Sequence, residues 1–470
     1  MMGTVGAFRK TGLLLVVLSI LMTGFSLVVA AQEPAAPAAT VEVPPAAPPA
    51  APEPAAAPAE EEEEAGPTID SGDTAWMLVS TALVLLMTPA LAFFYGGLVR
   101  SKNVLNTMMM SFVSLGFVSA LWALFGYSLA FGAGNSFIGD ASAFFMAGIG
   151  TEPGVLATIP GFVFVAFQGT FAIITAALIS GAIVERMRFP AYLLFICLWT
   201  LVVYSPLAHM VWGGGWLFKM GALDFAGGTV VHINAAVAAA VVVLCVGKRR
   251  DYKQAGLLPH NVPFVLLGSG MLWFGWFGFN AGSAGAANGI AGLAFATTMF
   301  APAGTVCVWA ILDLLRVGKV TAVGLATAIV VGLVAVTPAA GLISPMNALI
   351  LGGIAAVPSY LVLLWRANSG FDDSLDVVAA HGVGGTVGAL LTGVFADATL
   401  NGGLGNGALY GNTGQITTQL IAIGTAIAYS AVLSFILLKI VGIITPLRAD
   451  AESEASGLDT TEHGEEGYVH

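Results

Sequence analysis

The chain has 470 residues, of which 57% are hydrophobic and 9% are charged, whereas a soluble domain carries roughly a quarter charged residues. A mean hydropathy of +0.89 excludes an ordinary soluble globular domain and indicates a membrane protein. The formal net charge of -11 arises at the chain ends, since eight glutamates lie between Glu33 and Glu64, before the first long apolar stretch, and seven acids follow Arg448. The part between is nearly neutral, and no nucleic-acid partner is expected.

The N-terminus reads as a targeting segment followed by a linker. Arg9 and Lys10 precede an apolar core that ends in small residues, which predicts a signal peptide over residues 1–31; an uncleaved first helix is the alternative. Residues 32–70 are rich in Ala, Pro and Glu and predict a disordered linker in the periplasm. A membrane domain follows at 73–446, and residues 447–470 form a cytoplasmic tail.

Long apolar stretches recur along the membrane domain, each of about the 20 residues that a helix needs to cross a bilayer. Dividing the domain at charged and Gly/Pro-rich points predicts an all-α polytopic protein with eleven spans. Their expected ranges are 76–99, 104–131, 161–183, 191–207, 227–247, 262–281, 289–313, 321–337, 345–365, 379–396 and 415–445.

Lysine and arginine residues orient these spans. Thirteen of them, from Arg100 to Arg448, fall at one set of span ends, and Lys219 alone falls on the other side. Cytoplasmic loops carry the excess of Lys and Arg, so the mature N-terminus lies outside and the C-terminus in the cytoplasm. An odd number of spans likewise requires the two ends to lie on opposite sides of the membrane, and the signal peptide also indicates an outer N-terminus.

Two histidines occupy matching places in the chain. His232 lies in the fifth span and His381 in the tenth, so spans one to five and six to ten would form two five-helix halves of opposite orientation, followed by a final helix. Inverted repeats of this kind surround a midplane site in many transporters.

Helical spacing places small residues, such as Gly228 and Ala236, on the same face as His232, and Val230 and Ile233 on the opposite face. His232 therefore faces the bundle interior, and glycines around His381 indicate the same there. The alternative is a buried histidine that only bonds a neighbouring helix, but ionisable residues inside a membrane usually mark ion or substrate paths. Such a pair could also bind haem or a metal. No further ligands recur nearby at metal spacing, so no metal or cofactor is expected.

Aromatic residues form a second group. Phe167 and Phe171 lie one helical turn apart in span three, Trp276 and Phe279 share a face of span six with Ser283 a turn beyond, and Trp212 stands beside glycines after span four. Aromatic faces attract cations, more strongly where water is excluded. The alternative is an interfacial aromatic belt.

Six motifs together resemble the bacterial ammonium transporters of the Amt/Mep/Rh superfamily. In chain order they are "FYGGLVRSKNV", "AFQGTFA", "AHMVWGGG", "DFAGGTVVHINAA", "GWFGFNAGSAG" and "HGVGGTVG". The resemblance covers about Asp73 to the tail and implies a homotrimer with one pore per subunit. It also implies that the tail "GLDTTEHGEEGY" couples subunits and receives a PII-type regulatory protein.

The resemblance also assigns roles to single residues. Trp212, Ser283 and Phe171 match an outer site that recruits ammonium, Phe171 and Phe279 a stacked gate, and His232 and His381 the pore lining. Asp224 matches an acid at the outer end of span five that acts either in cation stabilisation or in structure.

The resemblance implies ammonium uptake across the bacterial inner membrane rather than an enzymatic reaction. Ammonium would lose its proton at the outer site and cross as ammonia, because a charge at the bilayer centre costs about 2.5 to 17 kcal/mol; whether methylammonium is a side substrate stays open. Two alternatives stay open: an ammonium sensor that acts through a recruited partner, and a bis-histidine haem protein.

Overall fold

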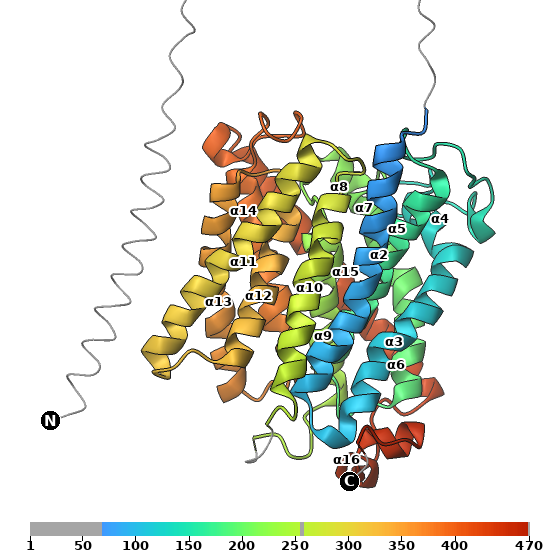
Figure 1. Cartoon of the computed structure of the whole chain (residues 1–470). Coiled ribbons are helices and arrows are strands. Elements are labelled where there is room, and N and C mark those ends of the chain that lie inside the picture. The colour runs from blue at the N-terminus through green and yellow to red at the C-terminus, as the bar shows by residue number, and fades with distance from the viewer. Residues whose placement is uncertain (1–67, 254–257, 469–470) are drawn as a thin grey trace, which may run out of the picture. The chain divides into compact units, whose positions relative to one another are not determined.

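A computed structural model describes residues 68–253 and 258–468. The predicted signal peptide and all but the last residues of the predicted linker lie outside this part of the chain. Within it, eleven helical stretches are long and apolar enough to cross a membrane, which confirms the predicted spans. They run side by side as one bundle (Figure 1).

The first half of the bundle has five spans. They consist of α2 (Ser71–Leu98); η1 (Ser101–Asn103), α3 (Val104–Leu121), η2 (Trp122–Gly126) and α4 (Tyr127–Phe131); α5 (Gly161–Ile179) with η4 (Ser180–Ala182); α6 (Phe189–Trp199), η5 (Thr200–Tyr204), α7 (Ser205–Val211) and α8 (Trp216–Lys219); and η6 (Gly228–Ile233) with α9 (Asn234–Val246). A short η3 (Phe144–Met146) lies in the loop after α4.

The second half has five spans, and the final helix α15 (Gly414–Ile444) and the tail follow it. The five spans consist of α10 (Val262–Gly282); α11 (Gly289–Arg316); α12 (Ala322–Val336) with η7 (Thr337–Ala339); α13 (Pro345–Asn368); and η8 (Val378–Val383) with α14 (Gly384–Phe395). A short η9 (Ala408–Tyr410) precedes α15, and the tail holds α16 (Ala451–Ser456) and η10 (Asp459–His463).

The leading helices of the two halves pack against each other in opposite directions. α2 and α10 lie side by side along their length (Figure 1). A Cβ on Gly268 would lie 2.4 Å from the backbone N of Phe94, and one on Gly275 would lie 2.4 Å from Cγ of Met87. Glycine at these two positions therefore allows the close approach, as small residues do at helix interfaces in membranes.

Two sequence-based details differ from the structure. Span four is longer than predicted, because the helix runs from Phe189 to Val211 through η5 and α7, and the short α8 follows after a glycine turn. Val230 and Ile233 are buried rather than on an outer face. The reason is that η6 is a π-helical turn packed among α5, α12, α14 and α15, so a regular helical spacing does not apply there.

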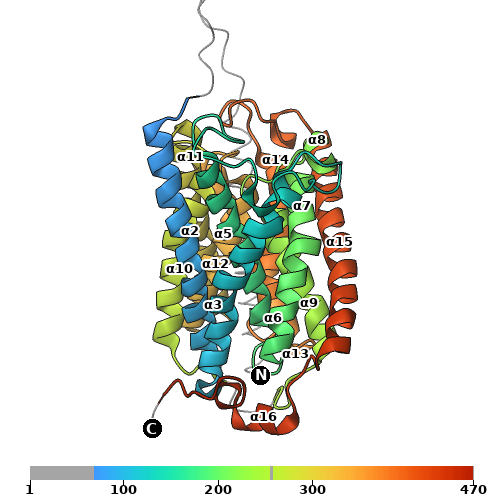
Figure 2. The same ribbon diagram turned by 90° about the vertical axis from the view of Figure 1, so that its right-hand side faces the viewer.

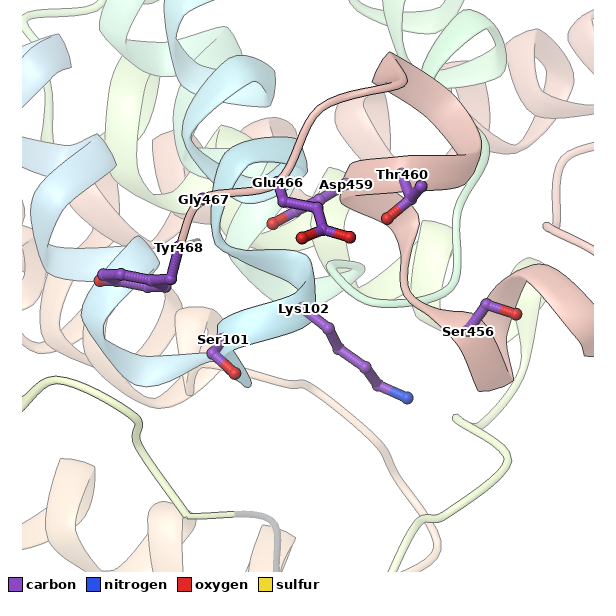
Figure 3. Close-up of a pocket in the computed structure, with 8 residues that line it drawn as sticks. All are labelled: Ser101, Lys102, Ser456, Asp459, Thr460, Glu466, Gly467 and Tyr468. Carbon is purple, nitrogen blue, oxygen red and sulfur yellow. The ribbon is translucent and has the colours of Figure 1, made fainter. Parts of the chain in front are cut away.

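The C-terminal tail folds back onto the helix ends at the predicted cytoplasmic side, below α3 and α6 (Figure 2). Asp459 accepts hydrogen bonds from the backbone N atoms of Leu105 and Asn106 at 3.1 and 2.8 Å. Lys102 donates to the carbonyl of Ala455, and both Lys102 and Asp459 line a pocket between the tail and the start of α3 (Figure 3). The tail is thus anchored to the second span.

Candidate functional site

The two histidines lie in corresponding π-helical turns. His232 belongs to η6 and His381 to η8, and each follows an aspartate, Asp224 or Asp373, by eight residues. Each carboxylate accepts hydrogen bonds from backbone N–H groups at the start of its turn, where a helix has unpaired donors. The repeated geometry supports an inverted relationship of the two halves.

The two imidazoles are in direct contact. Their Nδ1 atoms lie 3.2 Å apart and their ring centroids 5.3 Å apart. Both side chains are buried, and Nε2 of His232 has no hydrogen-bond partner in the described part of the chain. Both rings line a narrow cavity whose other walls are apolar, formed by residues that include Leu91, Phe94, Ile174, Leu178 and Val330.

A file of aromatic rings leads from the outer surface to this pair. Trp212 meets Phe171 edge to face at 6.2 Å between centroids, and Phe171 stacks on Phe279 at 4.2 Å. Phe279 in turn lies 6.0 Å from the His232 ring. Phe171 and Phe279 are 1% and 0% exposed, so the stacked pair closes the path between the surface and the histidine cavity.

An open vestibule lies at the outer end of the file. Trp212, Asp224 and Ser283 line it together with apolar residues. Ser283 donates its hydroxyl proton to the carbonyl of Phe279 at 2.8 Å, which leaves lone pairs on the oxygen to accept hydrogen bonds. The Trp212 indole donates to the backbone carbonyl of Asp224 at 2.8 Å. The vestibule combines an aromatic face with an acceptor, which suits a small cation.

The Asp224 carboxylate is occupied by its own segment. Its oxygens accept from the backbone N atoms of Gly227, Gly228, Thr229 and Val230, and from the Thr229 hydroxyl. Burial raises the pKa of this carboxyl, and these hydrogen bonds oppose the rise. Because a carboxylate has about four lone-pair sites, this geometry favours a structural role over direct contact with a cation.

Two glutamines of α15 hold the backbone beside the vestibule. Gln419 accepts from the N–H of Leu223 at 2.8 Å and donates to the Leu223 carbonyl at 2.7 Å and to the Ala389 carbonyl at 2.9 Å. Gln415 donates to the carbonyl of Gly221 at 2.9 Å. The amides thus tie the segment before Asp224 to the last two spans.

The described residues contain no group of three or more His, Cys, Asp or Glu side chains placed to hold a metal ion. A haem iron with two axial histidines would need them on opposite faces of its ring system. His232 and His381 instead contact each other through Nδ1, so the pair does not fit around a haem.

The sequence profile of the Ammonium Transporter Family matches residues 75–468. The chain belongs to this family. It is 47% identical over 399 residues to an ammonium transporter of Bacillus subtilis, covering 84% of this chain and 98% of that one. This family member also resembles the crystal structure of Candida albicans Mep2, with a TM-score of 0.78, 33% identity, and 82% and 88% of the two chains covered. A solved structure described as "Sensor Amt Protein" matches with a TM-score of 0.78 and 28% identity, over 83% of this chain and 98% of that one.

In this ammonium transporter family member, the residues singled out from the sequence come together at one site. Trp212, Phe171, Phe279, His232 and His381 form the file of rings, and Ser283 and Asp224 line its outer end.

Three residues of the site were not predicted from the sequence, namely Asp373, Gln415 and Gln419. The equal spacing of Asp224 and Asp373 before the two histidines is a sequence signal that identifies Asp373. The glutamines have no such signal, because their hydrogen bonds join parts of the chain almost 200 residues apart.

Proposed function

We propose that this protein carries ammonium across the membrane, with ammonia as the species that passes the pore. The observation that carries the proposal is the continuous file from Trp212 through Phe171 and Phe279 to the paired histidines, enclosed by apolar walls. Its membership in the ammonium transporter family supports the choice of substrate.

The outer site favours the cation. Trp212, Phe171 and the Ser283 oxygen replace part of the hydration of ammonium, through cation–π attraction and an accepted hydrogen bond. Methylammonium carries the same charge and N–H donors and is a side substrate of this site. Asp224 supports the site by capping η6 and by accepting the Trp212 indole on its backbone oxygen.

The passage beneath the gate favours the neutral molecule. Its walls are apolar apart from the two imidazoles, and a bare charge there costs several kcal/mol. Ammonium can lose a proton at the threshold, whereas potassium cannot. His232 and His381 then provide hydrogen-bonding groups without a fixed charge.

The direct test is the current that an ammonium pulse produces across proteoliposomes adsorbed on a supported membrane, measured together with uptake of labelled methylammonium. We expect both signals with the wild-type protein, and a loss of at least tenfold when His232→Ala and His381→Ala are combined. His260→Ala is the matched control, since His260 lies at the cytoplasmic end and bonds Val99 and Tyr468. Full transport by the double variant would refute the pore assignment.

A sensor role is the second candidate, favoured by the likeness to the structure described as "Sensor Amt Protein". In this version the site binds ammonium and the anchored tail relays occupancy to a recruited partner. Flux into proteoliposomes separates the two functions: a sensor binds ammonium, as seen by Trp212 fluorescence, but gives little flux.

We further propose that the protein forms a homotrimer in the bacterial inner membrane and receives a PII-type regulatory protein at its cytoplasmic face. Apolar side chains exposed on the bundle, such as Leu78, Phe274 and Met299, offer surface for other subunits or for lipid. Native mass spectrometry of the protein in lipid-like detergent tests the trimer, and pull-down by a purified PII-type protein tests the partner.

A further inference from the structure

One histidine outside the pore has an unusual set of partners. His209, in the last turn of α7, is 1% exposed. Its Nδ1 lies 3.0 Å from the carbonyl oxygen of Ala130, and its Nε2 lies 2.7 Å from the carbonyl oxygen of Asn135. A carbonyl oxygen can only accept a hydrogen bond, so each of these contacts requires a proton on the ring nitrogen.

A neutral imidazole has one N–H and cannot satisfy both contacts. The other histidines in the described part of the chain differ in this respect. His260 donates to the Val99 carbonyl, and its second nitrogen can accept from the Tyr468 hydroxyl. His463 bonds the Asn106 side chain through one nitrogen, and His232 and His381 share a proton. Among the histidines that the structure describes, only His209 has carbonyl oxygens at both ring nitrogens.

The surroundings of His209 favour a positive charge. Ala130 lies in the last turn of α4, where the second span ends, and His209 lies in the last turn of its own helix. The carbonyl end of a helix carries partial negative charge and attracts cations. Two such ends meet at the ring, which offsets part of the cost of burying the charge.

No carboxylate of the described residues bonds the ring. The titratable groups on the elements packed against α7 are Tyr127, Tyr204, Lys219 and His232, and the adjoining loops carry Asp140 and Asp224. The Asp140 carboxylate bonds Ser142, and that of Asp224 bonds the start of η6. The two carbonyl groups are therefore the direct partners of His209.

The glycines after Trp212 make this contact possible. A Cβ on Gly213 would lie 2.0 Å from the Ala130 oxygen and 2.8 Å from Nδ1 of His209. The backbone oxygen of His209 also accepts from the N–H groups of Gly213 and Gly215. His209 thus joins the end of the second span and its loop to the turn that begins at Trp212.

We infer that His209 is held as a doubly protonated imidazolium and acts as a positioning residue for Trp212. Its two N–H groups hold the end of α4 and the following loop against the end of α7 by hydrogen bonds. These bonds fix the position of the Trp212 indole at the vestibule. The role in substrate recruitment rests on the function proposed above, whereas the protonation state does not.

The protonation state is tested by solid-state NMR of the full-length protein in lipid bilayers, with histidine labelled by nitrogen-15, at about pH 7.5. This is roughly one unit above the ordinary imidazole pKa of about 6.5, so solvent-exposed histidines are mainly neutral. We expect one histidine with protons on both ring nitrogens, absent in His209→Gln and retained in His260→Gln. A wild-type spectrum with only neutral histidines would overturn the inference. This outcome is read from the wild-type protein alone, so it does not depend on whether a variant folds.

The positioning role is tested by transport kinetics. His209→Phe keeps a planar ring but removes both donors, and we expect KM for ammonium to rise on the order of tenfold with Vmax changed less than about twofold. His260→Phe should leave KM unchanged. An unchanged KM in His209→Phe would overturn the role. If the wild-type protein gives no ammonium current, the proposed function fails, while the spectrum still decides the charge of His209.

Discussion

The Nδ1 atoms of His232 and His381 lie 3.2 Å apart, so one proton between them serves both rings. A neutral imidazole carries a single N–H; the ring that donates through Nδ1 has an accepting Nε2, and its partner has a donating Nε2. The pair therefore offers one donor and one acceptor. Ammonia can both donate and accept, so it can bond both rings in turn.

The stacked pair Phe171 and Phe279 should select the molecules that pass according to their size. We expect Phe279→Ala to raise the ratio of methylammonium to ammonium current by about tenfold, because steric rejection of one extra methyl group is worth about 1–3 kcal/mol. Phe277→Ala is the control. Phe277 also belongs to a stacked pair, with a distance of 4.1 Å between its ring centroid and that of Phe295, but this pair is not part of the file. Equal ratios in the two variants would show that the stacked pair does not select.

The Ser283 hydroxyl should contribute to recruitment but not to passage. We expect Ser283→Ala to raise KM for ammonium about two- to tenfold, the equivalent of one hydrogen bond of about 0.5–1.5 kcal/mol, at nearly constant Vmax. Ser269→Ala is a matched control, because Ser269 makes the same kind of bond to the Leu266 carbonyl on α10. A fall in Vmax at constant KM would place Ser283 in a later step.

The Gln419 amide should stabilise both the fold and the outer site. Gln419→Leu removes the side-chain partner of the buried Ala389 carbonyl and of the half-buried N–H and carbonyl of Leu223, and a buried polar group left unpaired costs about 1–3 kcal/mol. We expect a lower melting temperature in detergent and a higher KM. Gln419→Glu keeps an acceptor for the Leu223 N–H, so its melting temperature and KM should lie between those of the wild type and of Gln419→Leu. If Gln419→Leu has the same melting temperature as the wild type, the hydrogen bonds of the Gln419 amide contribute no stability.

The Asp373 carboxyl should make stability depend on pH. Burial and the neighbouring Asp376 raise its pKa to about 7, from about 3.9 in an unfolded chain. The folded state therefore binds this proton more tightly than the unfolded chain does. The resulting contribution to the free energy of unfolding is fully present below about pH 4 and is lost as the pH rises through about 7.

The pH dependence is measured by melting in detergent between pH 4 and 8. We expect the Asp373→Asn variant, which cannot ionise, to lose less stability than the wild type over that interval. Parallel pH profiles of the two proteins would contradict the raised pKa.

The candidate site was largely predictable because most of its parts are local in sequence. The features that single out each residue lie within a few positions of it in the sequence. They are the glycines next to Trp212, the Phe167 ring one turn from Phe171, and the small residues around the two histidines. The hydrogen bonds of His209, Gln415 and Gln419 were not predictable, because they join segments that are far apart in the chain. Helical periodicity also failed at η6, where the backbone makes a π turn.

The sequence by itself determined the number of spans and predicted their orientation, since a bilayer imposes length and charge rules that act on each segment separately. Only the tertiary structure decided that the imidazoles touch through Nδ1, that the phenylalanines close the path, and that Asp224 is saturated by its own backbone. These features depend on how helices from distant parts of the chain pack together, and packing distances are not encoded in the periodicity of any one helix.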